Sequence, residues 1–129
     1  MSNSALQSRP GPATLKDILA EMTEAGDFQA AVLASTDGLV ISAISPAYDS
    51  ETIAATVSML QRVSNEAQRQ LRMGVIDEVV IRDEDRLRLI CRHVATETQD
   101  LLLVLVAPLQ YPYRRVSNRA IRQIKELLS

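Results

Sequence analysis

The first pattern in the chain is that of an amphipathic helix. Apolar residues between Leu15 and Met22 recur three or four positions apart, and Gly26 follows as a natural stop. Thr14 stands just before the pattern and Asp17 three residues later, which is the spacing of a capping box. We therefore expect a capped helix from Thr14 to Gly26.

Two β-hairpins are predicted from β-prone runs separated by turn residues. Residues 28–35 and 39–44 flank a turn that contains Gly38, and glycine can adopt the positive φ of a tight hairpin. Residues 76–82 and 87–94 form a second pair across the acidic turn Asp83, Glu84 and Asp85. Residues 101–107 are almost wholly apolar, which is typical of a central strand covered on both faces.

Two further helices are expected. The longer helix spans residues 51–73, stops at Gly74 and would measure roughly 35 Å at about 1.5 Å per residue. Pro112 is placed to open the last helix, in which one stripe is expected to be buried: Val116, Ala120, Ile124 and Leu127.

The order α-β-β-α-β-β-β-α predicts a fold of the α/β class, more narrowly α+β. In this fold, helices cover both faces of a five-stranded antiparallel sheet. A sheet covered on one face only would leave apolar surface exposed. We expect one domain over residues 14–129, preceded by a flexible tail over residues 1–13 that resembles neither a signal peptide nor a membrane anchor.

Composition limits the classes of function. The chain has 129 residues, a net charge of −2 and one cysteine, Cys91, so a disulfide or a cysteine-based metal site cannot form within one chain. This favours a reducing, cytoplasmic setting, and no apolar run reaches the roughly 18 residues of a membrane span. Residues 111–129 carry a charge of +4 on an otherwise acidic body.

The sequence of residues 30–41, AAVLASTDGLVI, resembles the first hairpin of the Roadblock/dynein-light-chain family. The resemblance extends through the opening helix, the long helix with Ala54, Ala55 and Leu60, the apolar strand and the closing basic helix, over about residues 14–128. Residues 14–129 are thus identified as a Roadblock-like domain.

The resemblance implies a dimer, either a homodimer or a heterodimer, in which two sheets join edge to edge through strand 76–82 while the long helices pack as an antiparallel pair; we expect the homodimer. It also implies a non-enzymatic regulator or adaptor without cofactors. Bacterial and archaeal members resemble regulators of Ras-like small GTPases, including the polarity GTPase of gliding bacteria, whereas eukaryotic members are dynein light chains or scaffolds. The expected activity is of the GTPase-activating type.

Candidate self-association residues follow from apolar positions that the core does not need. The long helix has one apolar stripe expected to seat it on its own sheet: Ile53, Val57, Leu60, Ala67 and Leu71. A second line and the predicted edge strand supply the candidate dimer interface: Met59, Val63, Val79, Val80 and Ile81. The alternative for Met59 and Val63 is a wide buried face of the same helix.

Polar positions of the long helix are the candidates for contact with a GTPase: Arg62, Glu66 and Arg69. The alternative is a solvated face on which Arg62 and Glu66 form an ordinary ion pair. A second basic row, made of Arg115, Arg119 and Arg122, could meet nucleic acid, anionic lipid or an acidic patch of a partner, but the acidic chain lacks tryptophan and any stacking platform. We therefore expect no binding to nucleic acid and no insertion into a membrane.

Catalytic chemistry has little support in the sequence. His93 alternates with apolar residues on one strand face, and a Cys and a His two positions apart are too few for a zinc site. The sequence contains no phosphate-binding Gly-rich loop and no Gly-x-Ser-x-Gly motif. Two other functions stay open: a scaffold without effect on GTP turnover, and a small-ligand sensor.

Overall fold

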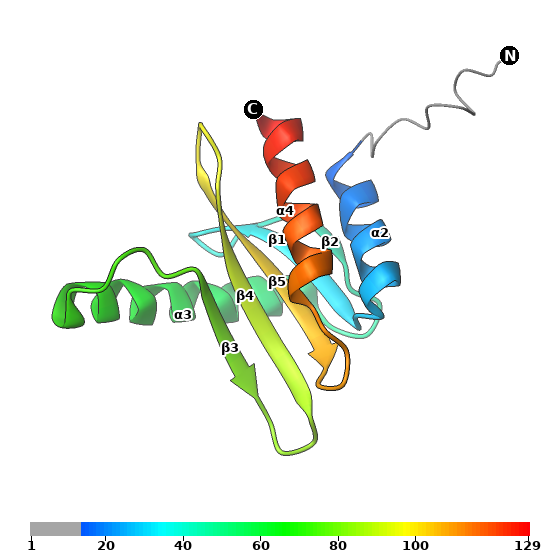
Figure 1. Cartoon of the computed structure of the whole chain (residues 1–129), viewed down its shortest axis with the longest axis horizontal. Coiled ribbons are helices and arrows are strands. Elements are labelled where there is room, and N and C mark those ends of the chain that lie inside the picture. Colours follow the sequence, from blue (N-terminus) through cyan, green and yellow to red (C-terminus); the bar gives the residue numbers. More distant parts are fainter. Residues whose placement is uncertain (1–13) are drawn as a thin grey trace, which may run out of the picture.

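The computed structural model describes residues 14–129, so the tail expected over residues 1–13 lies outside the described part of the chain (Figure 1). The described elements follow the predicted order: α2 (Leu15–Gly26), β1 (Ala30–Ser35), β2 (Val40–Ile44), α3 (Ser50–Leu71), β3 (Glu78–Arg82), β4 (Leu87–Ala95), β5 (Asp100–Pro108) and α4 (Arg114–Leu128). The strands form one antiparallel sheet in the order β2-β1-β5-β4-β3.

Strand β5 lies at the centre of the sheet. Val104 pairs with Val32 of β1 on one side and with Cys91 of β4 on the other. Every residue from Leu101 to Ala107 is buried, as its unbroken apolar run predicts. Alternate β5 side chains therefore enter two cores, one on each face of the sheet.

The helices are divided between these two faces (Figure 1). Helices α2 and α4 cover one core with Ile18, Leu19 and Ile124. Helix α3 covers the other with Ile53, Ala54 and Val57. This arrangement confirms the predicted sandwich.

Local signals explain how α2 and the first hairpin begin and end. The Thr14 hydroxyl accepts a hydrogen bond from the Asp17 amide at 3.1 Å, and the Asp17 carboxylate accepts one from the Thr14 amide at 3.1 Å, which confirms the capping box. Gly38 has φ 91°, as the turn requires. Helix α2 ends at Gly26, but the left-handed cap is Asp27 with φ 53°.

The predicted ends of the other helices need correction. Helix α3 ends at Leu71, with Arg72 as its left-handed cap. It therefore stops before Met73, the predicted last residue, and Gly74 is not its cap. Helix α4 begins at Arg114 and not directly after Pro112. Leu127, expected in the buried stripe, is 41% exposed because it lies in the last turn, near the chain end.

Candidate interaction surface on helix α3 and strand β3

The sheet-facing stripe of α3 continues beyond the sheet. Ile53 and Val57 are buried, Leu60 and Ala67 are half-buried, and Leu71 is 71% exposed. The expectation that the whole stripe seats α3 on its own sheet is therefore wrong for Leu71. Helix α3 contacts β1, β2 and β5, and Figure 1 shows its C-terminal half extending past β3.

The backbone of β3 presents unpaired groups along the sheet edge. The Asp77 carbonyl accepts from the His93 amide and the Asp83 amide donates to the Leu87 carbonyl, each at 3.0 Å. Because antiparallel strands alternate the direction of their backbone groups, the odd residues of β3 bond to β4 and the even residues point outward. Glu78, Val80 and Arg82 thus carry the outward N–H and C=O groups.

The three consecutive apolar residues of β3 divide between the faces of the sheet. Val79 pairs with Cys91 and Ile81 with Leu89, whose side chains lie on the α3 side. Val80 pairs with Ile90, which belongs to the core under α2 and α4. Val80 and Ile81 are 42% and 45% exposed, and Val79 is half-buried.

An apolar hollow of about 250 Å³ opens on the α3 side of the sheet, beside the first turn of α3. Its lining joins β3, β4 and β5: Tyr48, Ile53, Ile81, Asp83, Leu87, Arg88, Leu89 and Val106. The N-terminal half of α3 covers β1, β2 and β5, so of the helices within residues 14–129 only α3 borders the hollow, through Ile53 in its first turn.

Met59 and Val63 lie on the flank of α3. Helical spacing rotates both residues away from the stripe of Val57 and Leu60. Their exposed fractions are 58% and 66%. The alternative of a wide buried face for these two residues is therefore wrong within the single chain.

The three polar candidates lie on the exposed side of α3, with Arg62 and Arg69 pointing away from the sheet. The expected ion pair between Arg62 and Glu66 is absent from the described contacts. Instead the Arg69 guanidinium pairs with Glu66, and the Gln70 amide donates to the same carboxylate at 2.8 Å. Arg62 lines a polar hollow with Asp37 and Asp100.

A polar cluster fastens the edge strand to the start of α4. The Glu78 carboxylate accepts hydrogen bonds from the Tyr113 hydroxyl and the Arg114 guanidinium, both at 2.8 Å. The buried Arg92 donates to Ser117 Oγ at 2.7 Å and to Asn118 Oδ1 at 2.6 Å. Burial, and then the hydrogen bond to Glu78, raise the pKa of Tyr113.

The remaining candidates carry no catalytic arrangement. Burial raises the pKa of Cys91 to about 12, so its thiol stays protonated. His93 Nε2 lies 3.5 Å from Asp100 Oδ1. Between residues 14 and 129, no cluster of three or more His, Cys, Asp or Glu side chains could hold a metal ion. Over the same range, length and hydropathy rule out a membrane-spanning helix.

Sequence reasoning missed three exposed apolar residues at the end of α3 and in the loop that follows: Leu71, Met73 and Val75. The predicted length of the helix already indicated that its end would be exposed. Twenty-two residues span roughly 33 Å, whereas five strands span roughly 24 Å across a sheet. A helix that crosses the strands and is longer than the sheet is wide must leave one end uncovered.

Comparison with known proteins gives a consistent family and fold. The Roadblock/LC7 domain profile matches residues 14–107. Among proteins with curated descriptions, none matches this chain in sequence.

Solved structures share the fold at low sequence identity. Myxococcus xanthus MglB has a TM-score of 0.78 at 10% identity, with 92% of this chain and 98% of that chain covered. The gliding protein mglB from Thermus thermophilus has a TM-score of 0.75 at 19% identity, with 92% and 91% covered. A Roadblock/LC7 domain from Streptomyces avermitilis has a TM-score of 0.76 at 19% identity, with 90% and 98% covered.

Proposed function

The chain belongs to the Roadblock/LC7 domain family, and from that premise we propose that it is a dimeric, non-enzymatic regulator of a Ras-like small GTPase. The family consists of regulatory and adaptor domains. One observation carries the proposal: the apolar stripe of α3 runs past the edge of its own sheet and ends at the exposed Leu71. A second copy would supply the missing part of the sheet.

The dimer forms through the outward groups of β3. Two β3 strands, paired antiparallel about a two-fold axis, satisfy the backbone groups of Glu78, Val80 and Arg82 and remove an exposed edge. The two five-stranded sheets become one continuous sheet, and Val79 and Ile81 meet their counterparts on its α3 side.

Each α3 then covers apolar surface of the other chain. The end that bears Leu71 passes over the partner's β3 and β4, where the apolar hollow beside Ile81 and Leu89 lies open in the single chain. The two helices run side by side in opposite directions, with Met59 and Val63 between them. Burying these side chains stabilises the dimer by roughly 25 cal/mol per Å² of apolar surface.

The GTPase-binding surface is the outer side of the paired helices. Arg62, Glu66 and Arg69 remain exposed there, since they point away from the sheet. The dimer favours one arrangement of the GTPase switch loops by binding it more tightly, which requires no catalytic group on this chain. Hydrolysis is then accelerated by residues that the GTPase already has.

The first experiment tests the dimer with a backbone change. Val80→Pro removes one outward N–H group, while the hydrogen bonds of Val79 and Ile81 to β4 are retained. Sedimentation equilibrium should give a dimer for the wild type and a monomer for Val80→Pro, with unchanged circular dichroism. Val80→Thr keeps the N–H group and the β-branched shape, and this control should stay dimeric.

A dimeric Val80→Pro protein would refute the β3 seam. A second variant covers the case in which Val80→Pro does not fold: Ile81→Lys keeps the backbone intact and places a charge on the proposed contact. This variant should also be monomeric.

The regulatory activity is tested with the Ras-like GTPase of the same organism. Single-turnover GTP hydrolysis should accelerate on addition of the wild-type dimer, and Arg62→Ala with Arg69→Ala should weaken binding. Lys16→Ala with Lys125→Ala removes the same positive charge from exposed positions on α2 and α4, across the sheet from α3, and serves as the control. Tight binding with unchanged hydrolysis would instead identify a scaffold.

A further inference from the structure

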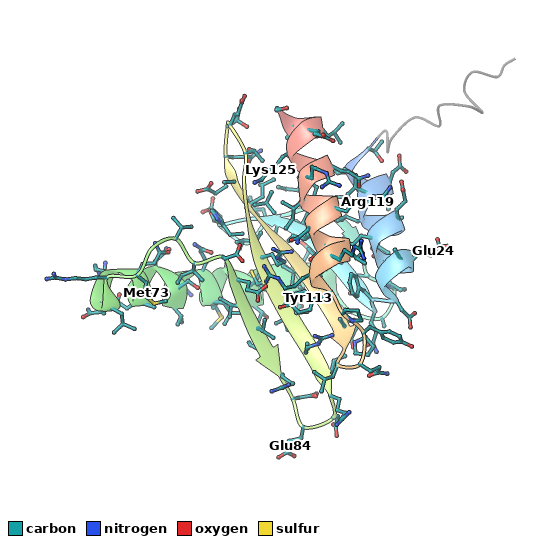
Figure 2. All side chains as sticks on the ribbon, in the orientation of Figure 1. Glu24, Met73, Glu84, Tyr113, Arg119 and Lys125 are labelled. Atoms are coloured by element: carbon teal, nitrogen blue, oxygen red, sulfur yellow. The ribbon has the colours of Figure 1, made fainter. Side chains whose placement is uncertain are left out.

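The outer sides of α2 and α4 carry opposite charges. Helix α2 presents an acidic row made of Asp17, Glu21 and Glu24, and helix α4 presents a basic row made of Arg115, Arg119 and Arg122. All six side chains are exposed, and none takes part in the ion pairs found within residues 14–129. Figure 2 labels Glu24 on α2 and Arg119 on the neighbouring α4.

The two rows are matched in height along the helix pair. Helices α2 and α4 lie side by side and run in opposite directions (Figure 1). Glu21 and Arg119 line the same groove, together with Ala25 and Val116. The acids follow each other at spacings of four and three residues, and the arginines at three and four in the reverse direction. With Glu21 level with Arg119, each of the other two acids therefore stands within one residue, or about 1.5 Å, of the height of one arginine.

This pattern is complementary to itself. A two-fold axis parallel to the helix pair keeps every residue at its height and places α4 of one copy over α2 of the other. The acidic row then faces the basic row twice in the same contact. A two-fold axis across the helices would place like charges together, and electrostatics disfavours that arrangement.

We propose that the α2–α4 face is a second self-association surface, whose partner is the same face of another copy. The groove between the helices gives the contact an apolar centre, because Met22, Ala25, Val116 and Ala120 line it. The surface lies on the opposite side of the sheet from α3, so its use is independent of the β3 seam. Dimers can join further copies through it.

The size of the surface indicates a weak contact. Helices of 12 and 15 residues are roughly 18 and 22 Å long. Two helices side by side, about 10 Å each in width, present roughly 400 Å² per copy, or roughly 800 Å² in total. Interfaces below about 1,200 Å² are typical of transient complexes. Association should therefore depend on protein concentration and on salt.

Sedimentation velocity of the full chain tests the proposal. At an ionic strength of about 0.01 M, where the Debye length is roughly 30 Å, the average mass should rise with concentration above that of the seam dimer. At about 1 M, where the Debye length is roughly 3 Å, this rise should disappear. A mass independent of concentration at low salt would overturn the proposal.

Charge reversal tests the geometry. The double variants E21R/E24R and R115E/R119E each bring like charges together in the contact, and each should associate at least about tenfold more weakly than the wild type. Both variants should fold, because the helix dipole favours arginine near the end of α2 and glutamate at the start of α4. Mixed in equal amounts, they should associate again, since each changed residue then faces a residue of opposite charge on the other variant.

The matched control is E84R/D85R, which changes the net charge as much as E21R/E24R but at the tip of the β3–β4 turn (Figure 2). This control should associate like the wild type. If the two charge-reversed variants associated no more strongly when mixed than each does alone, the face would not be self-complementary. Val80→Pro should leave this association intact, so failure of the β3 seam and failure of the α2–α4 contact give different results.

Discussion

The Tyr113 hydroxyl donates a hydrogen bond to the Glu78 carboxylate at 2.8 Å, although the two residues stand 35 positions apart in the chain. Glu78 belongs to the edge strand β3, and Tyr113 precedes α4. The contact therefore holds the proposed dimer strand against the last helix of the same chain.

Tyr113→Phe should destabilise the chain by about 1–2 kcal/mol, because it removes a hydrogen bond to a charged acceptor and leaves the ring in place. Urea unfolding measures the change. Tyr48→Phe is the matched control, since the Tyr48 hydroxyl donates at 2.8 Å to the neutral Gln29 side chain on the exposed surface. Tyr48→Phe should destabilise the chain by less than about 0.5 kcal/mol. Equal destabilisation by the two variants would show that the hydrogen bond to Glu78 contributes no more than an exposed one.

Gly26→Ala should destabilise the fold by about 1–3 kcal/mol, because an added Cβ would lie 2.3 Å from Cζ of the buried Phe28 ring. Thermal unfolding measures the loss. Gly74→Ala provides the comparison, as a Cβ there meets no atom within 4 Å. If Gly26→Ala were as stable as Gly74→Ala, Phe28 would have room to move away.

Cys91 should make stability fall at alkaline pH. Its pKa is raised to about 12 by burial, so in the unfolded chain the thiol loses its proton first, near the ordinary value of 9.0. The contribution is complete below pH 9 and is lost as pH rises toward 12, with a slope of at most about 1.4 kcal/mol per pH unit.

Urea unfolding at several pH values between about 8 and about 11 checks this dependence. The free energy of unfolding should fall less steeply with pH for Cys91→Ala than for the wild type, because the variant lacks the thiol. Parallel curves for the two proteins would contradict the assignment.

Val63→Lys should weaken the proposed dimer at least about tenfold, because it places a charge between the paired α3 helices. The folded monomer should be nearly unaffected, since Val63 is 66% exposed. Asn65→Lys adds the same charge to an exposed position on the opposite flank of α3 and should leave the dimer unchanged. Sedimentation equilibrium measures the dimer dissociation constant of both variants. If Val63→Lys dimerised as strongly as the control, Val63 would not lie in the interface.

Most of the fold could be predicted because its signals are local. The Thr14–Asp17 spacing predicts the start of α2, and the apolar run of β5 predicts its place at the centre. The Glu78–Tyr113 contact could not be predicted, since nothing in the sequence near either residue indicates the other. Periodicity likewise placed Leu71 on the sheet-facing stripe of α3 without indicating that the sheet ends before it.

The central place of β5 also determines when the chain can fold during its synthesis. Ribosomes release the N-terminal residues first, so β1 and β2 emerge long before β5, the strand that pairs with β1. Until residue 108 has left the exit tunnel, the sheet lacks its middle strand and the first hairpin and α3 have no complete core. Newly made chains should therefore fold only late in translation, and a chain truncated before residue 100, which lacks β5, should show no cooperative unfolding transition.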